Sequence, residues 1–105
     1  MAELVLLRPV HFPPGREDIG LDWLRQAMAA RRAAGMTYYA IVRSRTDPHD
    51  FLSLMVWPDQ ETYEAWHRSP ERARLFADQP HYLVREATRR YAVVSERRPP
   101  DSGPS

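Results

Sequence analysis

The sequence predicts an α+β domain of the ferredoxin-like βαββαβ type, a four-stranded antiparallel sheet with its helices on one face. Stretches with strand and helix character follow one another in the order strand, helix, strand, strand, helix, strand. The 105 residues suffice for one domain with a modest core. Two of the predicted strands are apolar on both faces, so a second layer must cover the sheet.

Residues 3–12 form the first β-rich run, in which Pro9 lacks a ladder donor and predicts an edge strand or a local distortion. A Pro-Pro-Gly sequence at residues 13–15 ends this run, and a helix is expected from about residue 17 to 34, with Gly35 as its stop signal. Its apolar positions recur at helical spacing, whereas three arginines are expected to face away from the core. The inward positions are Trp23, Ala27, Ala30 and Ala34, flanked by Leu24 and Met28, and the outward ones are Arg25, Arg31 and Arg32.

Residues 37–44 and 51–57 predict two strands joined by a turn at residues 46–50. Strands this close in sequence form an antiparallel hairpin.

The remaining helical sequence contains two cap signals. Asp59 precedes the first helix, and Ser69 with Pro70 behind it ends that helix and begins another, which runs to about residue 78. A last strand is expected over residues 88–95. The domain then spans residues 1–96, and residues 97–105, with three prolines and no large apolar residue, predict a flexible C-terminal tail.

The apolar strands predict a homodimer. Residues 4–7 show no polar alternation, and in residues 51–57 large apolar side chains point to both faces. Each large apolar side chain contributes about 1.5–3 kcal/mol when it is buried. A second copy of the sheet is the simplest cover for the face that the helices leave open.

Composition excludes several classes of function. The chain has no cysteine, and all 15 basic residues are arginine, which removes disulfides, thiol nucleophiles and Schiff-base lysines. A net charge of +1 gives no reason to expect nucleic-acid or membrane binding. No apolar run approaches the roughly 20 residues of a membrane span, and no export signal is recognised, so a cytoplasmic location is the expectation. The arginines at positions 43, 45, 89 and 90 are expected to be solvated strand ends.

Four residues between positions 53 and 66 predict a small-molecule pocket. Ser53 and Trp57 share one strand face, and Tyr63 and Trp66 share one helix face. If the helix packs back over its strand, two indoles, a phenol and a hydroxyl line one apolar space with a few polar points. The alternative is that these side chains are simply core.

The same segment resembles the antibiotic biosynthesis monooxygenase (ABM) family. The similarity covers about residues 3–96 and rests on Trp57, the Pro-Asp-Gln-Glu cap at residues 58–61, Tyr63, Trp66 and the helix break at residues 69–70. It implies a dimeric α+β barrel. Some members of this superfamily oxidise polycyclic phenols and anthrones without a cofactor, and others degrade haem.

In the cofactor-independent members, a strand-end tryptophan falls at Trp57 and a helix tyrosine at Tyr63. Their strand asparagine is replaced here by Ser53, and the position of their arginine falls near Phe76, with Arg74 the closest substitute. The resemblance therefore implies Trp57, Tyr63 and Ser53 as catalytic residues. Substrate contacts are then expected from Trp66, Phe76, Arg74, His11 and His81.

The haem-degrading branch fits less well. Its helix tryptophan falls at Trp66, but its haem-ligating histidine falls at Phe76 and its first-strand asparagine at Leu7. Without a histidine to bind the haem iron, haem degradation is not expected. No histidine pair has metal-binding helical spacing, so no metal site is expected. His67 is expected to face solvent, whereas His11 and His81 could reach a pocket rim as bases.

The sequence thus predicts a cofactor-independent monooxygenase-like homodimer that oxidises a small phenol, quinol or anthrone with dioxygen. Tyr63, Ser53 and the Trp57 indole N–H would stabilise the developing oxyanion. The alternative is a non-catalytic dimer of the same fold that binds a small hydrophobic ligand. No cofactor is expected in either case.

Overall fold

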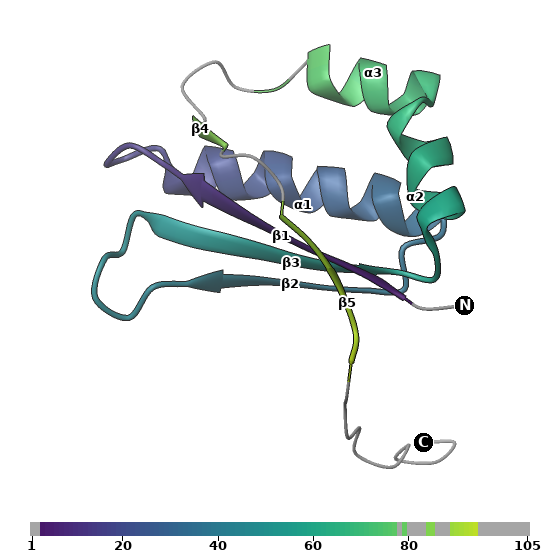
Figure 1. The fold of residues 1–105 in the computed structure, drawn as a ribbon. Helices are drawn as coiled ribbons and strands as arrows, with labels where there is room; N and C mark the ends of the chain where they lie inside the picture. Colours follow the sequence, from purple (N-terminus) through teal and green to yellow (C-terminus); the bar gives the residue numbers. More distant parts are fainter. Residues whose placement is uncertain (1–2, 78, 80–83, 86–88, 95–105) are drawn as a thin grey trace, which may run out of the picture.

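The computed structural model describes residues 3–77, 79, 84–85 and 89–94, and it places all three helices on one side of the sheet (Figure 1). The strands are β1 Leu4–His11, β2 Tyr38–Arg43, β3 Asp50–Trp57, β4 Val84–Arg85 and β5 Arg89–Ala92. The helices are α1 Glu17–Ala33, α2 Gln60–His67 and α3 Pro70–Ala77. This is the predicted α+β fold, with helix and strand limits close to those expected from the sequence.

The sheet is antiparallel throughout, with the order β2-β3-β1-β4, and β5 also pairs with β1. The predicted last strand corresponds to β5, and β4 is an additional short segment beside the same neighbour. The expected tail at residues 97–105 lies outside the described residues.

The expectation of an edge position for the first strand is wrong, because β1 has partners on both sides. On the side of β4 and β5, the described pairing covers Leu4–Leu7 and Val10–His11. On the other side, the register with β3 runs through Pro9, which lies opposite Leu52. The alternative expectation of a local distortion at Pro9 stays a prediction.

Side-chain caps fix the turn from the sheet into α2 and the break between α2 and α3. Asp59 Oδ1 accepts a hydrogen bond of 2.7 Å from the Thr62 N–H. Ser69 Oγ accepts one of 3.1 Å from the Arg72 N–H and donates one of 2.7 Å to the Trp66 carbonyl. Both predicted caps are confirmed. At the end of α1, Gly35 has a φ of +119°, in the region that favours glycine.

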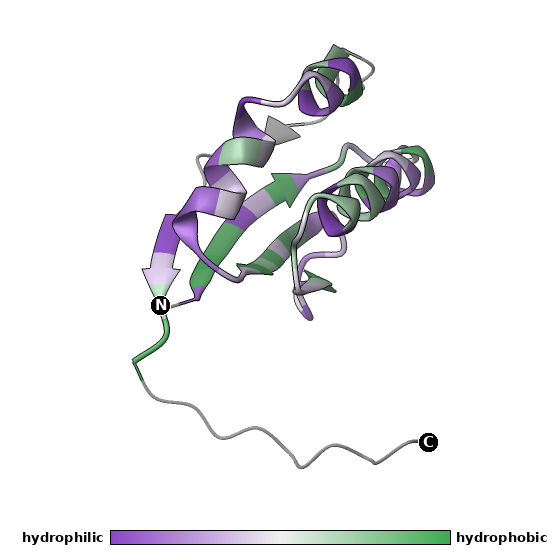
Figure 2. Ribbon diagram, turned by 90° about the vertical axis from the view of Figure 1, so that its right-hand side faces the viewer, coloured by the Kyte–Doolittle hydropathy of each residue, from purple (hydrophilic) through white to green (hydrophobic). Residues whose placement is uncertain are grey.

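One apolar core fills the space between the sheet and the helices. In Figure 2 the central strands are mostly hydrophobic, whereas the helices carry both kinds of residue. The buried hydrophobic residues are Leu6, Val10, Phe12, Trp23, Leu24, Ala27, Met28, Met36, Phe51, Met55, Trp57, Tyr63 and Trp66.

The opposite face of the sheet is apolar and is not covered by the helices (Figure 1). The register places Val5 opposite Val56 and Leu7 opposite Leu54 on this face. Tyr38 and Val42 on β2 are 57% and 48% exposed. The homodimer expected from this pattern stays a prediction. Among the described residues, no helix is long and apolar enough to cross a membrane.

Candidate functional site

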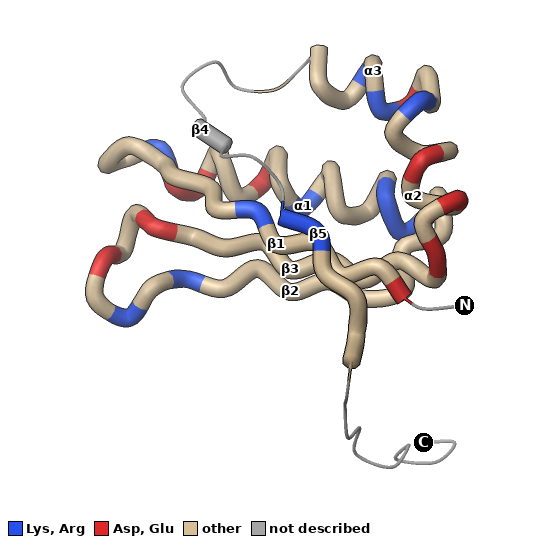
Figure 3. Tube along the Cα trace, in the orientation of Figure 1, with Lys and Arg blue, Asp and Glu red and all other residues tan. Residues whose placement is uncertain are grey.

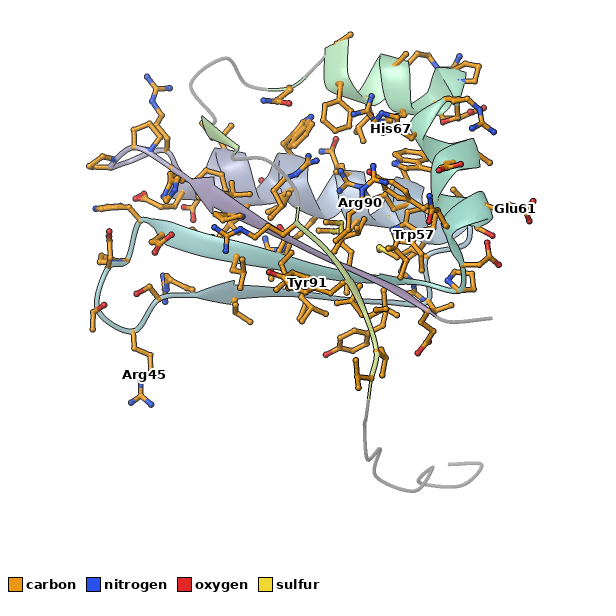
Figure 4. All side chains as sticks on the ribbon, in the orientation of Figure 1. Arg45, Trp57, Glu61, His67, Arg90 and Tyr91 are labelled. Atoms are coloured by element: carbon orange, nitrogen blue, oxygen red, sulfur yellow. The ribbon has the colours of Figure 1, made fainter. Side chains whose placement is uncertain are left out.

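The candidate site lies where α2 packs over the end of β3, on the helix-covered face of the sheet (Figure 4). Strand alternation points Ser53 and Trp57 to this face, where they are 2% and 0% exposed. Tyr63 and Trp66, on one side of α2, are also buried. The rings of Trp57 and Tyr63 meet edge to face, with centroids 5.6 Å apart. The predicted approach of the helix to its own strand is confirmed.

Two polar atoms of this site are buried without a hydrogen-bond partner among the described residues. They are the hydroxyl oxygen of Ser53 and the indole nitrogen of Trp57. Leaving a buried polar group unsatisfied costs about 1–3 kcal/mol. Trp23, by contrast, donates its indole N–H to the Leu75 carbonyl at 3.4 Å. Each of these two groups can donate a hydrogen bond to a ligand that reaches it.

Ser53 and Trp57 cannot hold the same oxygen atom. They are four residues apart on one strand, which separates their Cα atoms by roughly 13 Å. Met55 lies between them on the same face. The two donors therefore lie at opposite ends of the inner face of β3, and Trp57 is the one whose ring packs on Tyr63.

A small cavity lies between Tyr63 and the sheet. Its volume is about 10 Å³, the space of roughly one water molecule. A larger open groove of about 430 Å³ lies on the outer side, between α1 and α2. Trp66 lines both spaces. The cavity is lined by Leu6, Arg8, Arg31, Met55, Tyr63, Trp66 and Arg72.

Three of these lining residues are arginines, which the sequence analysis did not assign to the site. In Figure 3, β1, α1 and α3, which supply them, all carry positively charged segments. Arg31 is only 6% exposed. Burial, followed by the charge of Arg8, lowers its pKa to about 10, so it remains charged at neutral pH. Burial likewise lowers the pKa of Arg8.

The expectation that Arg31 faces away from the core is wrong. It follows Ala27 by four residues and Met28 by three, and both of these are buried on the inner side of α1. Side chains at these spacings share a helix face. This helical spacing predicts that Arg31 faces the core, whereas its charge led to the expectation that it faces solvent.

On α3, Arg72 rather than Arg74 lines the cavity. The Arg72 guanidinium lies 4.4 Å from the centroid of Phe76, whose ring in turn packs edge to face on Trp23. Arg74 is 72% exposed and lies 3.6 Å from the Glu71 carboxylate. Two residues rotate a helix by about 200°, so Arg72 and Arg74 point in nearly opposite directions.

The histidines are arranged differently from the expectation. His11 lies at the other end of β1, roughly 23 Å from the position paired with Trp57, and its Nδ1 is 3.4 Å from Asp50. It does not reach the cavity. His81 lies outside the described residues.

His67 is exposed, as expected, but it also adjoins the site. Its ring centroid is 5.9 Å from that of Tyr63, because the two residues are one helical turn apart. Desolvation lowers the pKa of His67, with further lowering from the charges of Arg72 and Arg90. Arg90 is not merely a solvated strand end, because its guanidinium lies 5.4 Å from the Tyr63 ring centroid.

Arg45 and Glu61 both point away from the site, Arg45 at the far end of the sheet (Figure 4). Within the described part of the chain, no group of three or more His, Cys, Asp or Glu residues could hold a metal ion.

Known structures share this fold at low sequence identity. SnoaB from Streptomyces nogalater, a cofactor-independent oxygenase solved as an asparagine-to-alanine variant, superposes with a TM-score of 0.79 at 10% identity, covering 90% of this chain and 95% of that one. PA3566 from Pseudomonas aeruginosa gives 0.73 at 22% identity, covering 90% and 97%. Rv0793 from Mycobacterium tuberculosis gives 0.74 at 16% identity, again covering 90% and 97%.

Among curated proteins, a comparison of sequences finds no match. The profile of the family described as "Antibiotic biosynthesis monooxygenase" matches residues 4–78, most of the chain and the whole segment from β1 to the end of α3. With this match and the fold described above, the chain belongs to the antibiotic biosynthesis monooxygenase family.

Proposed function

We propose that this protein is a cofactor-independent monooxygenase that oxidises a phenol, quinol or anthrone-type substrate with dioxygen. The observation that carries the proposal is the unpartnered Trp57 indole N–H beside the Tyr63 ring. In a site closed to water, such donors stabilise a developing oxyanion strongly, because they need no reorganisation during the reaction. SnoaB, of the same fold, is a cofactor-independent oxygenase, which supports the reaction class.

The substrate itself supplies the electrons in this chemistry. Removal of a proton from an anthrone-type CH₂ group gives an enolate, which transfers one electron to O₂. The resulting radical and superoxide combine into a C–O bond, and protonation gives a hydroperoxide. Loss of the remaining C–H proton, with cleavage of the O–O bond and departure of hydroxide, leaves a ketone and one water. One CH₂ and one O₂ thus become one C=O and one H₂O.

His67 is the best-placed base for the first proton transfer. Its lowered pKa keeps the imidazole neutral near pH 7, and neighbouring positive charges favour the enolate that forms. His67 is the last residue of α2 and is exposed, so it can pass the proton to solvent. We assign the developing oxygen charge to Trp57 and Tyr63, and the far end of the ring system to Ser53.

We further propose that the active form is a homodimer joined through the open face of the sheet. This face carries Val5, Leu7, Leu54 and Val56 on the two central strands. Covering it removes apolar surface from water, at about 25 cal/mol per Å². The site lies on the opposite face, so the dimer leaves the groove beside Trp66 accessible.

One observation favours the alternative, a non-catalytic ligand-binding module. The inner cavity, of about 10 Å³, does not admit an aromatic ring until Trp66 or α3 moves. α3 has no fully buried residue, and Leu75 and Phe76 are its partly buried contacts with the core, so its displacement loses less apolar burial than that of α1 or α2 would. Turnover therefore decides between the two functions.

The test is oxygen uptake by the purified protein, without added cofactor, across anthrones, quinols and naphthols. We expect one O₂ per ketone formed and a clear loss of uptake in Trp57→Phe. Trp23→Phe is the matched control, since it also shortens a buried indole but removes an N–H that already has a protein partner. Equal loss in both variants would contradict the role of Trp57, and no uptake with any compound would favour the binding module.

A further inference from the structure

We infer that the cavity beside Tyr63 recognises a carboxylate carried by the aromatic ligand, through Arg31, Arg72 and Arg8. The inference deepens the proposed function, because it takes this cavity as the place where the ligand binds and adds the chemical class of that ligand.

Arg31 carries the argument. It is only 6% exposed, and it borders the cavity. A guanidinium offers five N–H donors. Among the described residues, its hydrogen-bond contact is a weak one, from Nη1 to the Met28 sulfur at 3.7 Å. Its other contact is with the Phe76 ring, 5.9 Å from Cζ to the centroid.

Neighbouring charges make this burial less favourable rather than more. Arg8 and Arg72 act on Arg31 as like charges and lower its pKa, Tyr63 acts in the opposite direction, and no carboxylate is among the groups that shift the pKa of Arg31. A buried charge without an opposite partner is costly, and natural proteins retain one chiefly where a ligand supplies the partner. Three guanidinium groups around one cavity point to an anion.

The surroundings select a planar anion on an aromatic body. The planar fork of arginine matches a carboxylate in two parallel hydrogen bonds. The cavity has the space of roughly one water molecule, so it must widen to admit that group. The rings of Tyr63, Trp66 and Phe76 surround the same arginines.

The experiment is calorimetric titration with 2-naphthoate, its neutral isostere 2-naphthamide and 2-naphthyl phosphate. We expect the native protein to bind naphthoate at least about tenfold more tightly than naphthamide, as one charge-assisted contact would give. That ratio should fall to about one in Arg31→Met and persist in Arg32→Met, the exposed next residue of the same helix. Higher salt should reduce the ratio.

Folding does not obscure the result. Replacing an unpaired buried charge with an apolar side chain of similar length is often neutral or stabilising, so Arg31→Met should melt no lower than the native protein. Arg72→Gln is a second variant, on a helix with no buried residue, and should also reduce the ratio.

Each outcome decides the inference. No binding of naphthoate, equal binding of naphthoate and naphthamide, or an unchanged ratio in Arg31→Met would overturn it. Tighter binding of naphthyl phosphate than of naphthoate would instead assign the cavity to a phosphate ester. Oxygen uptake on neutral quinols without any carboxylate preference would refute the inference and leave the oxygenase. Binding of naphthoate that depends on Arg31, without turnover on any substrate, would support the inference and count against the proposed oxygenase.

Discussion

The indole of Trp57 and the phenol of Tyr63 meet edge to face, at 5.6 Å between centroids and an interplanar angle of 71°. Trp57 is the last residue of β3, and Tyr63 lies in the first turns of α2. The cap at Asp59 turns the chain sharply between them. A contact set by such a short connection holds both side chains in place before any substrate arrives.

Tyr63→Phe should lower kcat by about 10–100-fold and change KM little. In the proposed mechanism the phenol O–H stabilises charge that develops only in the transition state, whereas the ring remains to pack on Trp57. Steady-state oxygen uptake on a turned-over quinol or anthrone measures both constants. Tyr38→Phe, on the exposed outer face, is the control. Equal kcat values for Tyr63→Phe and the native protein would remove Tyr63 from the mechanism.

Ser53→Ala should stabilise the fold while it reduces activity. The Ser53 hydroxyl is buried and unpartnered among the described residues, so its removal ends a desolvation penalty of about 1 kcal/mol. Urea unfolding measures the gain. In contrast, Ser44→Ala should lose about 0.5–1.5 kcal/mol, because the Ser44 hydroxyl accepts from the Thr46 and Asp47 N–H groups. Destabilisation by Ser53→Ala would show that this hydroxyl has a structural partner.

Turnover should rise with pH, and the midpoint of the rise should lie below the ordinary histidine pKa of 6.5, since the pKa of His67 is lowered. Only the neutral imidazole accepts the substrate proton. His67→Gln should abolish this limb of the pH–rate profile. Arg72→Gln should move it to higher pH, because loss of a neighbouring positive charge makes the imidazolium less unfavourable.

The lowered pKa of His67 also makes the stability of the fold depend on pH. The folded state binds fewer protons than the unfolded state once the pH falls below about 6.5, so this group favours unfolding at lower pH. The C2 proton of His67, followed by NMR, reports the pKa directly. An unshifted titration would contradict both statements.

Gly20→Ala should destabilise the domain by about 1–3 kcal/mol without touching the site. A Cβ atom at position 20 of α1 would overlap the buried Phe12 ring, so the core must shift. Thermal and urea unfolding measure the loss, with oxygen uptake per folded molecule unchanged. Ala29→Gly, at an exposed position of the same helix, is the control, with a cost of about 1 kcal/mol from helix propensity alone.

Leu54→Arg should convert the proposed dimer into a monomer. Leu54 lies opposite Leu7 at the centre of the open face of the sheet, where a charge cannot be buried without a partner. Light scattering after size-exclusion chromatography measures the mass, and Arg45→Glu in the loop between β2 and β3 changes charge away from that face. A native protein of monomer mass at micromolar concentration would refute the dimer.

The sequence was sufficient for the fold because its local signals agree with one another. Asp59, Ser69 and Gly35 each place a helix limit that the structure reproduces, through a cap hydrogen bond or a positive φ. The alternation of β3 was enough to put Trp57 on the inner face. Such signals act within a few residues of the chain, where spacing alone fixes direction.

The arginines and His67 show where that reasoning stops. Charge predicts exposure for a residue considered alone, and Arg31 has a charge but also a place on the apolar side of α1. Its neighbours Arg8 and Arg72 come from a strand and a helix far away in the sequence. His67 is exposed, as its own position indicates, yet its pKa depends on arginines from β1, α3 and β5.

The sequence by itself determined the order of helices and strands, the inner faces of β3 and α2, and thus the meeting of Trp57 with Tyr63. Only the tertiary structure decided that β1 is central, that Arg72 rather than Arg74 faces the cavity, and that three guanidinium groups gather there. The reason is the range of the forces involved. Helix caps and strand alternation are local, whereas burial and Coulomb interactions depend on which distant segments the fold brings together.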